Sequence, residues 1–207
     1  MAQRKNAKNR IYVALADLLT FKKIEDITIS ELIKKAEISR NTFYYHFYSP
    51  EDAFETMIDS LIDGAQQRLA EVLESENSQF TDKELALYEY YYARKDLLLA
   101  VFASSKSRLF LIKFIRFIKT LYGHATLIFH DKNGNKVVLD ASDGEIFDFL
   151  INRTAFALYG FLEWWAATNF SITPQGFLDL QHKASNFYLD KYILGDENIR
   201  RPTLIDL

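Results

Sequence analysis

Apolar residues recur every three or four positions along most of the chain, which is the spacing of an amphipathic helix. This pattern predicts a first helix from about residue 3 to residue 21. Thr28 and Glu31 then have the spacing of a capping box, in which the threonine oxygen accepts a backbone N–H and the glutamate reaches back. A short second helix is therefore predicted to begin at Thr28 and to end at the sequence AEIS.

Two serine residues mark the beginnings of the next helices. Ser39 is expected to cap a third helix that runs to about Phe47, and Ser49, followed by Pro50, is expected to begin a longer fourth helix. In the third helix Phe43 and Phe47 are four residues apart, so they define its buried side.

The second half of the chain carries further helix starts. Between about residues 95 and 128 the sequence predicts two helices that break near Ser104–Ser105, and Thr173 before Pro174 predicts the start of the last helix. Two more capping boxes are expected to begin helices, at Thr81 with Glu84 and at Ser142 with Glu145.

One segment departs from the helical pattern. Asn133-Gly134 lies between two β-prone arms, which predicts a short β-hairpin near residues 126–140. In the predicted register Asp131 faces Lys136 and Phe129 faces Val138. The chain as a whole is predicted to be all-α, with about nine helices and this one hairpin.

The composition mainly shows which kinds of segment and site the sequence lacks. The 207 residues are 49% hydrophobic and 26% charged, which is typical of globular proteins. No apolar run is long enough to span a bilayer, and the first ten residues are too polar for a secretory signal. Cysteine is absent, which excludes disulfides and thiolate metal sites. We therefore expect a cytoplasmic protein with no membrane contact, no metal and no cofactor.

Charge divides the chain unevenly. The first 50 residues hold nine basic and five acidic side chains, a balance of +4, whereas the remainder holds 16 basic and 23 acidic ones, a balance of −7. A basic segment on an acidic chain suggests that the basic segment meets a polyanion. If charge were the only clue, a solvated charged face would be the better explanation.

The third helix offers a polar surface opposite its buried side. At about 100° per residue, Asn41 and Tyr45 point most directly away from Phe43 and Phe47. Three helices in the first 47 residues, with a tight turn before the third, have the spacing of a helix-turn-helix, whose third element lies in the DNA major groove. Hydrogen-bonding groups and amphipathic rings suit base edges and phosphates. The neighbours of this face are Thr42, which lies close by, and Arg40, Tyr44 and His46 on its flanks.

The segment ITISELIKKAEISRNTFYYHFYSPEDAF resembles the DNA-binding segment of the TetR/AcrR family of transcriptional regulators. The matching pieces are the Thr28 cap, Ser39-Arg40-x-Thr42, the aromatic run of residues 43–47 and the acidic start of the fourth helix. The resemblance covers residues 10–60. It implies a helix-turn-helix DNA-binding domain at residues 1–48 and a helical effector-binding and dimerisation domain at residues 49–207.

The family also implies partners and a mode of action. Its members are homodimers on palindromic double-stranded DNA operators, usually repressors that a small-molecule effector releases. In this chain we expect base contacts from Asn41, Thr42 and Tyr45. Phosphate contacts are expected from Thr28, Ser30, Tyr44 and His46, and Ser39 and Arg40 complete the predicted DNA-binding set.

Two positions depart from the family pattern. The turn before the third helix commonly carries glycine, whereas this chain has Glu37. The family usually places a phosphate-contacting lysine at the start of the fourth helix, where this chain has Pro50, which supplies neither a charge nor an N–H.

The C-terminal half suggests an effector site and a dimer surface. Arg153 lies on an apolar side of the helix that follows residue 144; pairing with a buried carboxylate is the favoured interpretation and an anionic effector the alternative. The other residues expected at an effector cavity are Tyr88, Tyr91, Phe114, Phe117, Asn152 and Tyr159. The residues expected at a dimer interface are Gly160, Phe161, Trp164, Trp165 and Phe187. The alternative is that these rings pack within one chain, although adjacent helix positions such as Trp164 and Trp165 cannot share one face.

Two other classes of function remain open. An enzyme would need a catalytic motif, but the four histidines are scattered, with no HExxH pair and no glycine-rich phosphate loop. We therefore do not expect catalysis. A helical protein-interaction module is the other alternative, and a lack of DNA affinity would favour it.

Overall fold

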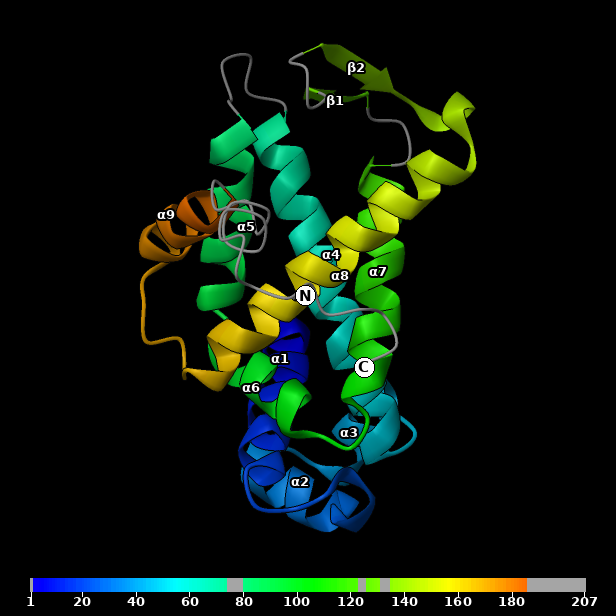
Figure 1. Ribbon diagram of the computed structural model, residues 1–207. Helices are drawn as coiled ribbons and strands as arrows, with labels where there is room; N and C mark the ends of the chain where they lie inside the picture. Colours follow the sequence, from blue (N-terminus) through cyan, green and yellow to red (C-terminus); the bar gives the residue numbers. More distant parts are fainter. Residues whose placement is uncertain (1, 74–79, 123–125, 131–134, 186–207) are drawn as a thin grey trace, which may run out of the picture.

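The computed structural model describes residues 2–73, 80–122, 126–130 and 135–185. Over these residues the chain forms nine α-helices, two short 3-10 helices and one antiparallel hairpin (Figure 1). The predicted all-α fold class is confirmed. Among the same residues no helix combines the length and the apolar composition that a membrane crossing would require.

The first three helices lie together at one end of the molecule (Figure 1), and we call α1, α2 and α3 the head. They hold together because each contributes side chains that are completely buried, among them Ile11, Leu32 and Phe43. The elements are α1 (Ala2–Leu19), the 3-10 helix η1 (Ile24–Asp26), α2 (Ile29–Ala36) and α3 (Arg40–His46).

The remaining helices, which we call the body, follow α4, the long helix that leads away from the head. α4 packs against α5 and α7, α7 packs against α8, and α9 packs against α5. α1 packs against α6 as well as against α2, so the first helix contacts both head and body. The body elements are α4 (Pro50–Leu73), α5 (Phe80–Tyr92), α6 (Lys95–Ala103), α7 (Ser107–Tyr122), α8 (Glu145–Ala167) and α9 (Pro174–Ser185).

Aromatic rings fill the core of the body. Tyr91 and Phe114 lie 6.5 Å apart between ring centroids, and Phe114 in turn contacts Tyr159 at 6.1 Å. Trp165 stacks on Phe177 at 4.3 Å, which joins α8 to α9. Large rings of this kind bury much apolar area for each side chain.

Three of the predicted helix starts in the body can be compared with the structure. Thr173 is confirmed, because its side-chain oxygen accepts a hydrogen bond from Gly176 N at 3.2 Å just as α9 begins. The predicted capping role of Ser142 is wrong. Asp140 accepts hydrogen bonds from Ser142 N and Oγ at 2.7 and 2.6 Å and caps the 3-10 helix η2 (Ala141–Asp143), and α8 begins only after Gly144. Thr81 is not a cap either, since α5 already begins at Phe80.

The hairpin is confirmed but its predicted register is wrong. β1 (Leu127–His130) pairs with β2 (Lys136–Leu139), with Phe129 opposite Val137 and His130 opposite Lys136. This register is one residue away from the predicted one, which assumed a two-residue turn at Asn133-Gly134. In the observed pairing, the number of residues between His130 and its partner Lys136 is odd, whereas a two-residue turn would need an even number. Asp131 lies outside the described residues.

Candidate nucleic-acid interface

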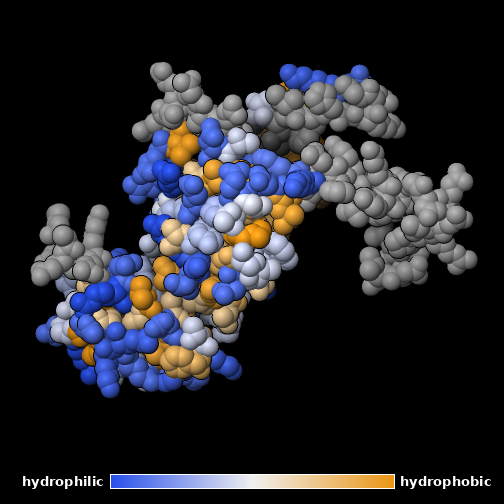
Figure 2. Space-filling model, turned by 90° about the vertical axis from the view of Figure 1, so that its left-hand side faces the viewer, coloured by the Kyte–Doolittle hydropathy of each residue, from blue (hydrophilic) through white to orange (hydrophobic). Residues whose placement is uncertain are grey.

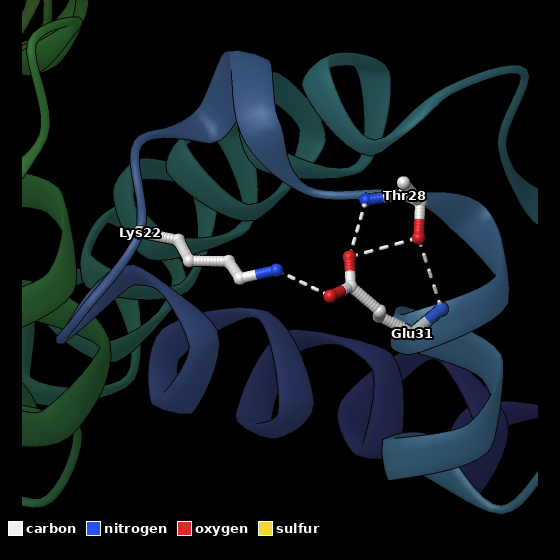
Figure 3. A network of polar contacts seen from close by, with 3 residues as sticks. All are labelled: Lys22, Thr28 and Glu31. Carbon is white, nitrogen blue, oxygen red and sulfur yellow. Dashed lines mark hydrogen bonds and ion pairs between the residues drawn. The ribbon is translucent and has the colours of Figure 1, made fainter.

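A network of side chains sets the start of α2 (Figure 3). The Thr28 oxygen accepts a hydrogen bond from Glu31 N at 3.2 Å, and the Glu31 carboxylate accepts one from Thr28 N at 3.0 Å, which confirms the capping box. Lys22, from the segment after α1, forms an ion pair with the other carboxylate oxygen of Glu31. These contacts lower the pKa of Glu31 to about 2. The Lys22 contact has the largest effect, and the Thr28 hydrogen bonds come next.

This network already uses the hydroxyl of Thr28. Thr28 Oγ1 donates to Glu31 Oε2 at 2.8 Å, so a phosphate at this hydroxyl would compete with a carboxylate for the same proton. Thr28 and Ser30 are both exposed at the beginning of α2. Their predicted phosphate contacts remain predictions.

The turn between α2 and α3 adopts a left-handed conformation without glycine. Glu37 has φ 50° and ψ 50°, which costs a residue with a Cβ atom about 1–2 kcal/mol. Ile38 N donates to Ile33 O at 3.1 Å, the long hydrogen bond that closes this kind of helix end.

Arg10 of α1 reaches the same turn. Its Nε donates to Ala36 O at 2.7 Å, and its Nη2 donates to the carbonyl oxygens of Ala36 and Glu37. The last carbonyls of a helix have no partner within the helix, so these bonds complete the end of α2. No local sequence pattern reveals this role, because 26 positions separate Arg10 from Ala36.

α3 is only seven residues long and depends on its surroundings. Ser39 caps it by accepting a hydrogen bond from Thr42 N at 3.0 Å, as predicted. Phe43 and Phe47 are buried, and the ring of Phe47 lies 5.9 Å from that of Tyr12 on α1. These contacts fix which side of α3 faces outward.

The outward side of α3 is the predicted one. Asn41 and Arg40 are exposed, 64% of Tyr45 and 48% of Tyr44 are exposed, and the Arg40 guanidinium lies 6.0 Å from the Tyr44 ring. Thr42 and His46 are half-buried at its edges. Beside this face lies a groove of about 550 Å³, whose lining includes Arg10, Ser39, Asn41, Thr42, Tyr45 and His46.

The start of α4 offers no cation at the position where the family places lysine. Pro50 is buried. Ser49 Oγ accepts a hydrogen bond from Asp52 N at 3.2 Å, and the Asp52 carboxylate accepts one from Tyr48 N at 2.8 Å. The polar groups at this helix start are therefore bonded to one another. A phosphate contact by residue 50 is therefore not available.

The residues expected at an effector cavity divide into two groups. Five rings, those of Tyr88, Tyr91, Phe114, Phe117 and Tyr159, are buried in the body. Asn152 instead donates to Asp148 O, one turn earlier on α8. The hydroxyl of Tyr91 is buried with no hydrogen-bond partner among the described residues, and burial raises its pKa.

The interpretation of Arg153 as a buried, paired charge is wrong. Arg153 is exposed on α8, and among the described residues no carboxylate forms an ion pair with it. The side of α8 that carries Arg153 points outward: Phe149, four positions earlier on this helix, is 63% exposed. The core-facing side of α8 carries Phe147, Ile151, Ala155 and Leu162.

The residues expected at a dimer interface also divide into exposed and buried ones. Gly160, Phe161 and Trp164 are exposed, and with Phe177 and Leu180 they line a groove of about 590 Å³ between α8 and α9. Trp165 is not part of this surface. It is completely buried, stacks on Phe177 and donates from Nε1 to Ile172 O at 3.0 Å. Phe187 lies outside the described residues.

Comparisons with known proteins agree with this geometry. The chain is 36% identical over 61 residues to the HTH-type transcriptional repressor NemR of Escherichia coli, which is 30% of this chain and 31% of that protein. It is 35% identical over 74 residues to the HTH-type transcriptional regulator EthR of Mycobacterium tuberculosis, 36% of this chain and 33% of that protein. The matches thus span about a third of the length of these curated relatives.

A comparison of structures extends further along the chain. A solved structure of a candidate regulator of fatty acid metabolism from Clostridium perfringens matches with a TM-score of 0.53 over 82% of this chain and 92% of that one. At 17% identity this likeness establishes the fold alone. No protein-family model matches the sequence. The resemblance to helix-turn-helix regulators of the TetR/AcrR family is confirmed by the relatives that match.

Proposed function

We propose, from the resemblance to TetR/AcrR regulators, that this chain is a sequence-specific DNA-binding transcriptional regulator, a repressor that binds a palindromic operator as a homodimer. The observation that carries the proposal is the outward face of α3. Asn41 and Tyr45 project from a short helix whose opposite side, Phe43 and Phe47, is fixed in the core. Such a face can reach base edges in the major groove.

Charge supports the same partner. The first 50 residues carry a balance of +4 on a chain whose net charge is −3. Figure 2 shows that the end of the molecule that carries α2 and α3 is mostly hydrophilic on the face in view. A cationic polar end on an acidic body is attracted to a polyanion such as DNA and orients the molecule toward it.

A homodimer is proposed because one seven-residue helix supplies too few contacts for tight, specific binding. The groove between α8 and α9 offers a surface for a second copy. Trp164 and Phe161 are partly exposed there, and an added Cβ atom at Gly160 would meet nothing within 4 Å, so another helix could approach closely. Covering these rings would remove apolar area from water.

A small-molecule effector is proposed to act on the body. The buried ring cluster around Tyr91 contains one polar atom, the Tyr91 hydroxyl, that has no partner among the described residues. A buried hydroxyl without a partner costs about 1–3 kcal/mol, so a ligand that offers an acceptor there would recover that energy. An apolar or aromatic compound with a hydrogen-bond acceptor fits this environment best.

Selection from a pool of randomised DNA duplexes tests the proposal. The wild-type chain should enrich sequences with two inverted half-sites whose centres lie roughly 10 base pairs apart, or a multiple of that spacing. A variant with Asn41→Ala and Tyr45→Ala, folded as judged by its helical circular dichroism, should enrich none. If the wild-type chain enriches no sequence, a helical protein-interaction module becomes the better explanation.

A further inference from the structure

We infer that Arg10 is a positioning residue for DNA recognition: it holds the left-handed turn at Glu37 and thereby sets the direction of α3. This inference rests on the proposed function. It assigns a role in recognition to a side chain of α1, which is not one of the two helices, α2 and α3, that flank the turn.

The backbone of Arg10 is well placed to act as a fixed point. Ile11, the next residue along α1, is completely buried in the core of the head. From this anchored position the guanidinium crosses to α2 and donates to two successive carbonyls, those of Ala36 and Glu37. A planar guanidinium can bridge two acceptors in a defined geometry, which a single ammonium group cannot do in the same way.

The two carbonyls that Arg10 holds belong to the turn that orients α3. Glu37 is left-handed at φ 50°, a conformation that glycine adopts easily and glutamate does not. Ser39, two residues later, caps α3. A change in the backbone angles of Glu37 would therefore rotate the whole of α3, and the side chains of Asn41 and Tyr45 with it.

The contacts of Arg10 favour positioning over direct phosphate binding. The Nε and Nη2 groups of Arg10 donate to backbone oxygens of the turn, so these donors are already used. The apolar contacts of the head, such as those of Leu32 and Phe43, do not depend on Arg10. Loss of the bridge should consequently leave the helices formed but loosen the direction in which α3 points.

The test compares five proteins on two duplexes: the wild type, Arg10→Lys, Arg10→Met, Glu37→Gly and the double variant of Arg10→Lys with Glu37→Gly. One duplex is the sequence that the wild type enriches from a randomised pool, and the other is a scrambled sequence of the same length. For Arg10→Lys the ratio of the two affinities should fall about tenfold, comparable to the loss of one base contact. The slope of log K against log salt should stay unchanged, because lysine keeps the charge.

Glycine at position 37 provides the rescue. Because glycine adopts the left-handed conformation without steric cost, Glu37→Gly should keep the wild-type ratio, and the double variant should regain most of the ratio lost in Arg10→Lys. Because Glu37→Gly also removes a conformational cost of about 1–2 kcal/mol, all proteins are compared well below their thermal midpoints, where a difference in general stability leaves the folded fraction and the affinity ratio unchanged. Helical circular dichroism and thermal midpoints verify that each variant is folded.

Two results would overturn the inference. One is an unchanged affinity ratio in Arg10→Lys. The other comes from Arg10→Met: a salt slope lower by about 0.9 per half-site with an unchanged ratio would identify Arg10 as a phosphate contact instead. If the wild type binds both duplexes equally, the proposed function itself fails. This outcome can be told apart from the two results that would overturn the role of Arg10, because both of those require a wild type that binds the enriched duplex more tightly than the scrambled one.

Discussion

The side chains of α3 are where recognition is proposed to occur, and two neighbouring tyrosines should behave differently. Tyr45 projects directly away from the core, so Tyr45→Ala should reduce the preference for the enriched duplex over a scrambled one. Tyr44 lies on the flank, where its hydroxyl is expected to hold a phosphate, so Tyr44→Phe should weaken binding to both duplexes alike. Fluorescence anisotropy with labelled duplexes measures both effects. The assignment would be wrong if Tyr45→Ala changed neither the affinity nor the preference.

Glu31 gives a prediction for pH. Its pKa is lowered from 4.5 to about 2 in the folded chain, chiefly by the Lys22 contact and then by Thr28. The ionised carboxylate therefore stabilises the folded state at pH values above about 4.5, and this contribution is lost as the pH falls toward 2. Glu31→Gln should destabilise the chain at pH 6, and the difference from the wild type should shrink between pH 5 and pH 2.

Urea unfolding at a series of pH values measures this difference. Glu55→Gln is a suitable control, since Glu55 is an exposed glutamate on α4. The control should differ much less from the wild type at pH 6. A constant gap between wild type and Glu31→Gln from pH 6 to pH 2 would contradict the assigned cause of the lowered pKa.

Residue roles that depend on local spacing could be predicted, and those that depend on distant contacts could not. Thr28 with Glu31 is a capping pair three residues apart, and the Phe43–Phe47 pair follows from helical geometry alone. Arg10 acts on a carbonyl 26 positions away, which no local pattern reveals. For Arg153 the prediction is wrong because an apolar side of a helix is not always its buried side, and the apolar side of α8 that carries Arg153 points outward.

At the scale of whole elements, the packing of α4 on α5 depends on a glycine. An added Cβ atom at Gly64 would lie 2.1 Å from the hydroxyl oxygen of Tyr90, a nearly buried side chain that also donates to Ser60 O at 3.2 Å. Gly64→Ala should therefore destabilise the chain by about 1–2 kcal/mol, because overpacking outweighs the better helix propensity of alanine. Gly160→Ala, measured at a concentration below that at which the proposed dimer forms, is the control, since nothing within one chain lies within 4 Å of its added Cβ atom.

Denaturant unfolding of both glycine variants measures the two effects. We expect the unfolding midpoint of Gly64→Ala to fall and that of Gly160→Ala to stay the same or rise. An unchanged midpoint for Gly64→Ala would mean that the Tyr90 ring moves aside at little cost.

Elements whose ends carry their own signal were predicted well. The helix starts at Thr28, Ser39 and Thr173 are confirmed, because each residue caps the backbone immediately after it. Ser142 has the same spacing to a glutamate but is bonded by Asp140, a competing acceptor two residues earlier. The hairpin followed from its β-prone arms, whereas its register depended on the loop between them.

At the scale of the whole molecule, the exposed groove of α8 and α9 predicts a dimer. Light scattering at micromolar concentration should give twice the chain mass of 24.1 kDa. Gly160→Arg should lower this mass, because a long charged side chain would prevent close approach of a second helix. Ile112→Arg, at an exposed position on α7, should leave it unchanged. A monomer that still binds an operator tightly would contradict the proposed assembly.

The general architecture was accessible from the sequence, but the chemistry of the body was not. Five of the residues expected at an effector cavity are buried rings, and burial alone does not distinguish a ligand site from an ordinary aromatic core. Trp164 and Trp165 show the same limit. Their adjacency required that they point to different sides, but only the structure reveals that Trp165 is the buried one.

The central claim is that the outward face of α3 reads a DNA sequence, and a competition mobility-shift assay tests it most directly. The duplex that the wild type enriches from a randomised pool should be retarded by nanomolar to micromolar protein, and about a hundredfold excess of a scrambled competitor should leave the complex intact. An excess of the unlabelled enriched duplex should abolish it. Equal competition by the two sequences, or no retarded band at low salt, would contradict the account.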